Sequence, residues 1–182
     1  MKTLVRFWLL WVCFGAYSLV LGQKKMEFRF ASDGTFRILQ LTDVHWSPSS
    51  SVNTKNENLI TDLILQEKPD LVVLSGDIVT QSPVEEGWSA IADIFARSGQ
   101  RWTAVLGNHD HEGDKNKQEI AQYLEGLPFF VGYSEAVSGV LNHTIDLFKY
   151  DGSEVGGRLV LMDTHDYTSS IFFHPMGEIR LG

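Results

Sequence analysis

The sequence predicts an α/β fold, because short apolar runs alternate along the chain with segments whose apolar residues recur at helical spacing. The apolar runs are typical of strands buried on both faces, and the periodic segments are typical of amphipathic helices. Small clusters of polar side chains follow three of the apolar runs. Alternating strands and helices imply βαβ units and a sheet that is at least partly parallel, with functional groups at the carboxyl ends of its strands.

The first expected elements are two strands and a helix. Residues 26–30 alternate like a strand, residues 32–35 (SDGT) predict a turn, and residues 36–42 (FRILQLT) predict the second strand. Apolar residues between positions 59 and 64 then recur at helical spacing. This helix is expected to end near Pro69.

The middle of the chain continues the alternation. Residues 71–74 (LVVL) and 102–106 predict two buried strands. Between them, the apolar residues of segment 88–95 share one helical face, and segment 120–127 predicts a third helix that stops at Pro128. Two strand–helix units are therefore expected in succession.

The last two expected strands, residues 144–150 and 158–162, flank a turn at residues 151–157. The chain of 182 residues contains no internal repeat and no low-complexity tract. A chain of this length is sufficient for one domain with a substantial core.

The charge balance bears on possible partners. The formal net charge is −8, from 23 acidic and 15 basic residues, and no basic run offsets it. A surface of that sign repels the phosphate backbone, so we expect no nucleic-acid partner. An acidic protein can still act on small phosphates, because bound cations dominate the local field at such a site.

The N-terminal sequence is typical of a targeting segment. Lys2 and Arg6 precede an apolar stretch over residues 7–21, and a cut is expected between Gly22 and Gln23. Residues 1–22 are therefore interpreted as a signal peptide, with the domain in residues 23–182. The alternative is a retained membrane anchor, because the stretch is only slightly shorter than a spanning helix. Secretion to an extracytoplasmic compartment is the expectation, and membrane contact is expected only if the segment is retained.

The polar clusters carry side chains suited to metal ions. Each cluster follows a predicted strand; in chain order they are Asp43 and His45, then Asp77, then Asn108, His109 and Asp110. Carboxylates, imidazoles and an amide oxygen suit ions such as zinc, manganese or iron. Gly76 and Gly107 permit tight turns that let the side chains converge. Two ions about 3.5–4 Å apart would clamp a phosphoryl group and supply an activated hydroxide for in-line attack.

These clusters resemble a known family. Asp43-Val-His45, Gly76-Asp77 and Gly107-Asn-His-Asp110, within ILQLTDVHW, PDLVVLSGD and AVLGNHDHEG, are similar to the first three blocks of the calcineurin-like metallophosphoesterase superfamily, and to its purple-acid-phosphatase-like branch in particular. The resemblance extends from Phe36 to about Asp166. It implies a four-layer αββα sandwich, of which this chain is expected to hold the N-terminal portion.

The resemblance also implies roles for single residues. Asp43 and His45 would bind the first metal, Asp77 would bridge both metals, and Asn108 would bind the second. His109 would act on the phosphoryl group rather than on a metal. Asp110 would orient its ring, since a carboxylate fixes the tautomer of an imidazole.

Part of the family pattern is missing. The family supplies a further lone histidine and a Gly-His-x-His block downstream, and no Gly-His-x-His occurs among the six histidines of this chain. We therefore interpret residues 23–182 as a C-terminally truncated domain. His174, in IFFHP, is a weak candidate for the lone histidine.

The resulting functional expectation is hydrolysis of phosphoric esters at a two-metal site with divalent or trivalent ions of the iron, manganese or zinc class. The alternative is a non-catalytic fragment that retains a partial metal site. The sequence leaves open whether the ester is a monoester, a diester or a nucleotide. Asn142-His-Thr144 forms an N-glycosylation acceptor sequence, which matters only in a glycosylating secretory pathway.

Overall fold

A computed structural model describes residues 27–47 and 50–166. The expected signal segment 1–22 and His174 lie outside these residues. No helix in the described ranges is long and apolar enough to cross a membrane. The elements, in chain order, are β1 (Phe28–Arg29), β2 (Ile38–Leu41), α1 (Asn53–Glu67), β3 (Leu71–Ser75), α2 (Val84–Ser98), β4 (Trp102–Val105), α3 (Lys117–Glu125), β5 (His143–Phe148) and β6 (Val155–Leu161).

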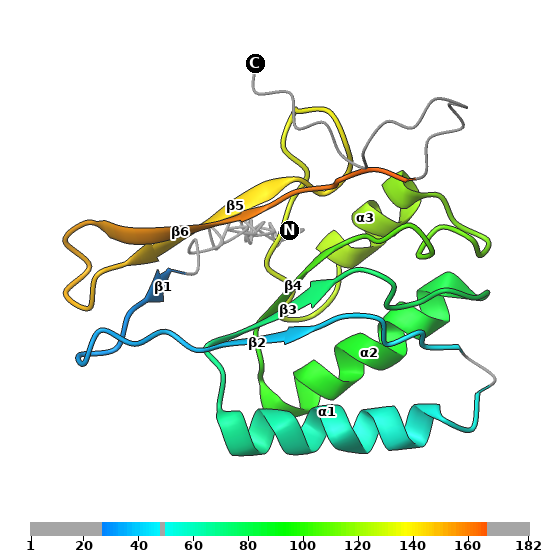
Figure 1. The fold of residues 1–182 in the computed structure, drawn as a ribbon, viewed down its shortest axis with the longest axis horizontal. Coiled ribbons are helices and arrows are strands. Elements are labelled where there is room, and N and C mark those ends of the chain that lie inside the picture. The colour runs from blue at the N-terminus through cyan, green and yellow to red at the C-terminus, as the bar shows by residue number, and fades with distance from the viewer. Residues whose placement is uncertain (1–26, 48–49, 167–182) are drawn as a thin grey trace, which may run out of the picture.

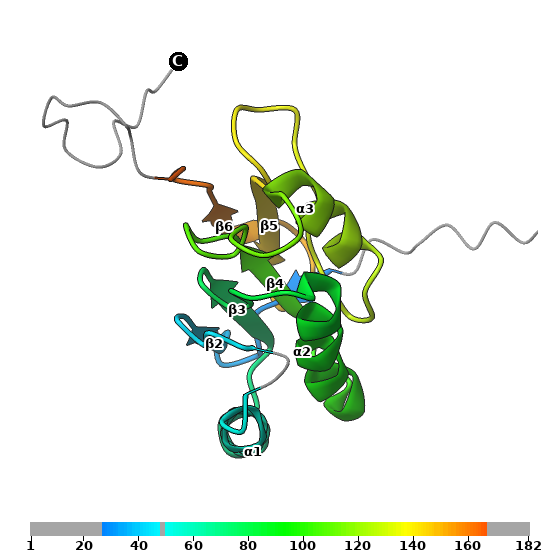
Figure 2. The same cartoon turned by 90° about the vertical axis from the view of Figure 1, so that its right-hand side faces the viewer.

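The α/β prediction is confirmed, and each expected strand and helix corresponds to an observed element. Strands β2, β3 and β4 form one parallel sheet in that order. A second sheet has the order β1-β5-β6, and the two strands expected around a turn, β5 and β6, pair in it as an antiparallel hairpin. Helices α1 and α2 lie on one side of the first sheet and the second sheet lies on its other side (Figures 1 and 2). The described residues thus form three layers, helix, sheet and sheet, of the expected αββα sandwich.

Two apolar clusters hold these layers together. Between the helices and the parallel sheet, the Trp88 and Trp102 rings stack with centroids 6.3 Å apart, and the Phe95 ring lies 5.3 Å from Trp102. A smaller cluster between the two sheets contains Phe28, Leu71, Leu147 and other residues of both sheets. Burial of such aromatic and branched side chains is the main stabilising contribution to a fold of this kind.

Strand register brings the functional loops together. Leu41 of β2 lies opposite Leu74 of β3, and Ser75 lies opposite Val105 of β4, so the three strands end at nearly the same level. The loops that follow them therefore emerge at one edge of the sheet, which is where ligand sites form in open parallel sheets.

Asn142 is held at the start of β5, although it begins the acceptor sequence noted above. Its side-chain amide donates to the carbonyl of Ser138 at 2.6 Å, and its amide oxygen accepts from the backbone N–H of Asp163 at 2.5 Å. The residue is only 8% exposed. In the folded chain its amide nitrogen is therefore not accessible for modification.

Candidate metal centre

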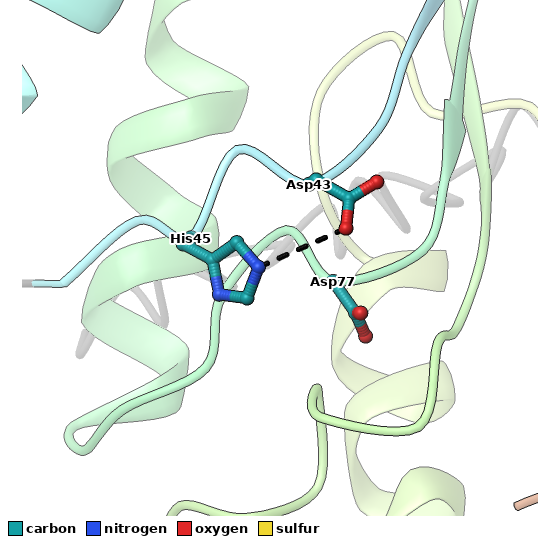
Figure 3. A group of neighbouring side chains, drawn as sticks. All are labelled: Asp43, His45 and Asp77. Carbon is teal, nitrogen blue, oxygen red and sulfur yellow. Dashed lines mark ion pairs between the residues drawn. The ribbon is translucent and has the colours of Figure 1, made fainter.

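The carboxyl edge of the parallel sheet gathers three of the predicted metal ligands. Asp43 and His45 follow β2, and Asp77 follows β3. One ligand atom from each lies within 4.8 Å of the others, and His45 Nε2 is 3.8 Å from the nearer Asp43 oxygen (Figure 3). Two carboxylates and an imidazole at this spacing suit a borderline divalent cation. We refer to Asp43, His45 and Asp77 as the triad.

All three triad residues have left-handed backbones. The φ angles are 54° at Asp43, 48° at His45 and 56° at Asp77. This conformation costs a residue with a Cβ atom roughly 1–2 kcal/mol. Backbone hydrogen bonds hold it in place, because the N–H of Asp43 donates to the carbonyl of Gly76 at 3.1 Å and the N–H of His45 donates to that of Asp77 at 3.0 Å. The backbone strain thus lies at the three residues whose side chains converge, as is common at functional sites.

Two glycines allow the loops after β3 and β4 to touch. A Cβ atom at Gly107 would lie 2.2 Å from Oδ1 of Asp77, and one at Gly76, whose φ is 103°, would lie 3.0 Å from the Cα atom of Gly107. Only glycine fits at such a close approach. The two glycines, which were expected to permit tight turns, therefore also permit the two loops to approach each other closely.

The loop after β4 brings Asn108 and His109 against the triad. The backbone N–H of His109 donates to Oδ1 of Asp77 at 3.0 Å, and the His109 ring lies 6.1 Å from the ring of His45. The side-chain nitrogen of Asn108 is buried and has no hydrogen-bond partner among the described residues. Asn108 is thus held in the loop next to the triad with its side-chain nitrogen unpaired among the described residues.

Asp110 does not orient the His109 ring, contrary to the expectation from the family resemblance. Instead, the ring nitrogen Nδ1 of His109 lies 2.7 Å from the carboxylate of Glu112. The hydrogen bond to Glu112 raises the pKa of His109, with smaller contributions from the charges of Glu112, Asp77 and Asp110, while desolvation lowers it. The motif did not predict Glu112 as the partner of His109, although a carboxylate three residues after the histidine, in the same loop, points to it.

Asp110 ties two loops together. Its Oδ2 accepts backbone N–H groups from Asp77 at 2.9 Å and Gly107 at 2.7 Å, and its Oδ1 accepts those of Ile78 at 2.8 Å and Val79 at 3.0 Å. The side chain is fully buried. Burial raises the pKa of Asp110, and the four N–H donors oppose that rise. The carboxylate therefore fixes the position of Asp77 relative to the loop after β4.

The other described histidines lie in separate clusters. His143 is buried, with Nε2 2.8 Å from the hydroxyl of Thr103 and Nδ1 2.7 Å from the carbonyl of Leu141. His111 lies 3.6 Å from Asp166. Asp166 also binds Lys117 of α3, as does Asp163, and His165 lies 4.0 Å from Asp163. Among the described residues, only the triad brings three metal-type ligands together.

The fold and the triad define an α/β protein with a candidate metal centre at the carboxyl edge of a parallel sheet. The family described as calcineurin-like phosphoesterase matches residues 36–176, more than half of the sequence, and this chain belongs to that family.

Several curated proteins are similar to this chain. Probable inactive purple acid phosphatase 29 of Arabidopsis thaliana is 27% identical, over 80% of this chain and 44% of its own length. Probable inactive purple acid phosphatase 14 of the same plant is 34% identical, over 57% of this chain and 30% of its own length. Phosphatase DCR2 of Saccharomyces cerevisiae is 27% identical, over 75% of this chain and 28% of its own length. The chain spans less than half the length of these relatives.

Among solved structures, the nuclease MPE of Pseudomonas putida is similar over 62% of this chain and 60% of that chain, at 17% identity and a TM-score of 0.38. A likeness of this size carries no argument about function.

Proposed function

We propose that this chain carries the site of a metal-dependent hydrolase of phosphoric esters. The observation that supports this most is the triad, which places two carboxylates and an imidazole within 4.8 Å of one another in a chain of the calcineurin-like phosphoesterase family. In this proposal Asp43, His45 and Asp77 hold a first ion. Asp77 and Asn108 hold a second, so that Asp77 is shared.

The described residues offer three ligands to a first cation and two, Asp77 and Asn108, to a second. Asp43 and His45 are exposed, so they are accessible to an ion and a substrate from solvent. Asn108 lies in the loop that contacts Asp77; its unpartnered atom is the side-chain nitrogen, and the oxygen of the same amide is a suitable hard ligand. When bound, two such ions polarise a phosphoryl group and activate a water molecule. Iron, manganese and zinc all suit this ligand set, and nothing in it selects one of them.

His109 supplies the protein's own contribution to the reaction. Its ring lies beside the triad, and its backbone N–H is bonded to Asp77. We assign to its Nε2 the stabilisation of charge on the phosphoryl oxygens or the transfer of a proton to the leaving oxygen. Asp110 has a supporting role, because it holds the loops of Asp77 and His109 together.

The test measures metal content and hydrolysis on the same preparations. The chain would be loaded with zinc, manganese or iron, and bound metal per folded chain would be determined by elemental analysis. Hydrolysis of p-nitrophenyl phosphate and of its bis-ester would then be assayed. We expect Asp77→Ala to lose both metal and activity, and His109→Ala to lose activity while retaining metal. The control is Asp151→Ala, in the exposed turn of the β5–β6 hairpin. Undiminished hydrolysis in either site variant would refute this mechanism.

A second candidate function is metal binding without catalysis. Two of the similar proteins named above are described as probable inactive purple acid phosphatases. Among the described residues, the second ion would also have only Asp77 and Asn108 as protein ligands, which is few for a firmly held ion. One ion per chain, together with no hydrolysis by the wild type, would favour this candidate. Two ions per chain would favour the phosphoesterase.

We further propose that residues 1–22 are a cleaved signal peptide and that the protein is exported. The basic start and the apolar stretch that follows it support this proposal. Mass spectrometry of the mature N-terminus decides it. A chain beginning at Gln23 is the expected result, and an intact N-terminus would indicate a membrane anchor instead.

A further inference from the structure

Beside the triad, the His109 ring contacts a carboxylate of its own loop. The Nδ1 atom of His109 lies 2.7 Å from Oε1 of Glu112, and the backbone N–H of Glu112 donates to the carbonyl of His109 at 3.1 Å. The two residues thus share one tight turn that is closed twice, once through the backbone and once through the side chains. The turn fixes the distance between the ring and the carboxylate.

The other carboxylates near His109 are already bound to backbone groups. Both oxygens of Asp110 accept backbone N–H groups. Oδ1 of Asp77 accepts the backbone N–H of His109 itself. Glu112 is thus the carboxylate that contacts the His109 ring in the described part of the chain.

This contact determines which ring nitrogen carries the proton in neutral imidazole. A carboxylate accepts hydrogen bonds, so Nδ1 must donate and the hydrogen must be on Nδ1. Nε2 is then the nitrogen left for a bound substrate. The ring that presents it lies 6.1 Å from the ring of His45, a triad member, and so lies next to the place where a phosphoryl group is bound in the proposed reaction.

We propose that Glu112 is the positioning residue for His109: it fixes the Nδ1–H tautomer of the neutral ring and the orientation of the ring, so that Nε2 is left for the phosphoryl group and donates to it when the ring is protonated on both nitrogens. The reaction part of this proposal rests on the proposed function, whereas the tautomer and the ring orientation do not. Glu112 thereby takes the role that the family resemblance implied for Asp110.

The first test measures the tautomer of the His109 ring directly. Nitrogen-15 NMR of the full chain, without metal and at a pH where the ring is neutral, distinguishes Nδ1–H from Nε2–H. We expect Nδ1–H in the wild type and a mixture of tautomers in Glu112→Ala. Glu112→Gln should also show a mixture, because its amide can accept from Nδ1–H through the oxygen or donate to an unprotonated Nδ1 through the nitrogen. The matched control is Glu154→Ala, which removes an exposed glutamate that is paired with Lys149 in the β5–β6 hairpin. Its spectrum should match that of the wild type.

The second test measures kcat and KM for ester hydrolysis by the metal-loaded chain. Glu112→Ala should lower kcat by roughly tenfold to a hundredfold, because a misplaced catalytic group has that order of effect. KM and bound metal should change little. In a His109→Ala background, Glu112→Ala should have no further effect, since a residue that acts only through the ring has nothing left to position. Glu112 is more than half exposed, so these variants are expected to fold, and circular dichroism checks this.

The outcomes separate the two proposals. A wild-type ring with hydrogen on Nε2, or one whose tautomer Glu112→Ala leaves unchanged, overturns the positioning role whatever the activity. The same holds if Glu112→Ala lowers kcat equally with and without His109. If the tautomer changes as expected but no preparation hydrolyses an ester, the positioning of the ring is supported and the proposed hydrolysis fails.

Discussion

At the scale of single residues, each member of the triad has an unfavourable, left-handed backbone conformation. In the proposed site the residue at position 45 supplies an imidazole for a metal ion, yet its φ of 48° favours glycine. We expect His45→Gly to be more stable than His45→Ala in the metal-free chain by about 1 kcal/mol, because alanine keeps the left-handed strain and glycine does not. Urea denaturation measures the difference.

The control for this prediction is the same pair of substitutions at Asp62, which is exposed in helix α1. There glycine should be the less stable of the two, by about 1 kcal/mol, because the position is helical. If glycine is also the less stable variant at position 45, the strain ascribed to the triad is wrong.

Asp110 is expected to matter for stability even though it does not touch the His109 ring. In Asp110→Asn one acceptor oxygen becomes an amide donor. Because each oxygen of Asp110 accepts two backbone N–H groups, either orientation of the amide leaves two of them unsatisfied. We expect a loss of about 2–4 kcal/mol in the free energy of unfolding. Asp33→Asn, in an exposed turn, is the matched control and should cost far less. Equal costs at the two positions would contradict this account.

The sequence predicted the triad but not the partner of His109, for physical reasons. Asp43, His45 and Asp77 directly follow strands, so the parallel sheet alone brings them to one edge. The partner of His109 depends instead on how the next few residues turn. That turn places Glu112 against the ring, and Asp110 is directed to the backbone of a neighbouring loop.

At the scale of elements, local sequence patterns predicted the presence of each helix and strand more accurately than the residues at which it begins and ends. Helix α1 begins at Asn53, well before the apolar residues that predicted it. Its first turn is polar, so no apolar periodicity reveals where the helix starts. Strand β1 is only two residues long. Its extent depends on pairing with β5, which lies more than a hundred residues further along the chain and which no local pattern reveals.

The buried histidine that begins β5 links this strand to β4. Burial lowers the pKa of His143, while its hydrogen bond to the carbonyl of Leu141 opposes that effect. Its Nε2 faces the hydroxyl of Thr103 in β4. On acidification the unfolded chain therefore binds a proton at this residue before the folded chain does. Stability is expected to fall as the pH decreases from about 7 towards about 5.

This pH dependence is measured by urea denaturation at a series of pH values. His143→Gln should be less stable near neutral pH and should show a shallower decline on acidification, because the buried titrating group is gone. His165→Gln, at a side chain that is 62% exposed, controls for the removal of one histidine. An unchanged slope in His143→Gln would show that other groups cause the acid sensitivity.

At the scale of the whole molecule, the described layers leave strand edges unpaired. Within these residues β2 pairs only with β3, and its Ile38 is 42% exposed. Strand β6 is also an edge, but it contains two glycines and Arg158, and its pairing with β5 has an irregular register. Such features discourage pairing with other chains, and β2 lacks them. The order of strands in a sheet is not visible in local sequence patterns, so this asymmetry could not be predicted from the sequence.

We therefore expect the chain to self-associate through β2 as its concentration rises. Ile38→Lys should keep it monomeric, because a charge on an edge strand opposes pairing. Size-exclusion chromatography with light scattering over a range of concentrations measures this. The matched control, Val160→Lys, changes a side chain on β6 that is 59% exposed and should leave the association as it is. If only Val160→Lys prevents association, the edge has been assigned to the wrong sheet.

The enclosed amide of Asn142 has a consequence for the production of this protein in cells that attach oligosaccharides. Attachment requires an accessible amide nitrogen, whereas the folded chain bonds that nitrogen to Ser138 and buries it. A sugar added during synthesis would therefore prevent the start of β5 from reaching its native place. Glycosylated and native chains are then separate populations. The fraction of chains whose electrophoretic mobility is shifted, and restored by an endoglycosidase, would therefore measure the fraction that failed to fold.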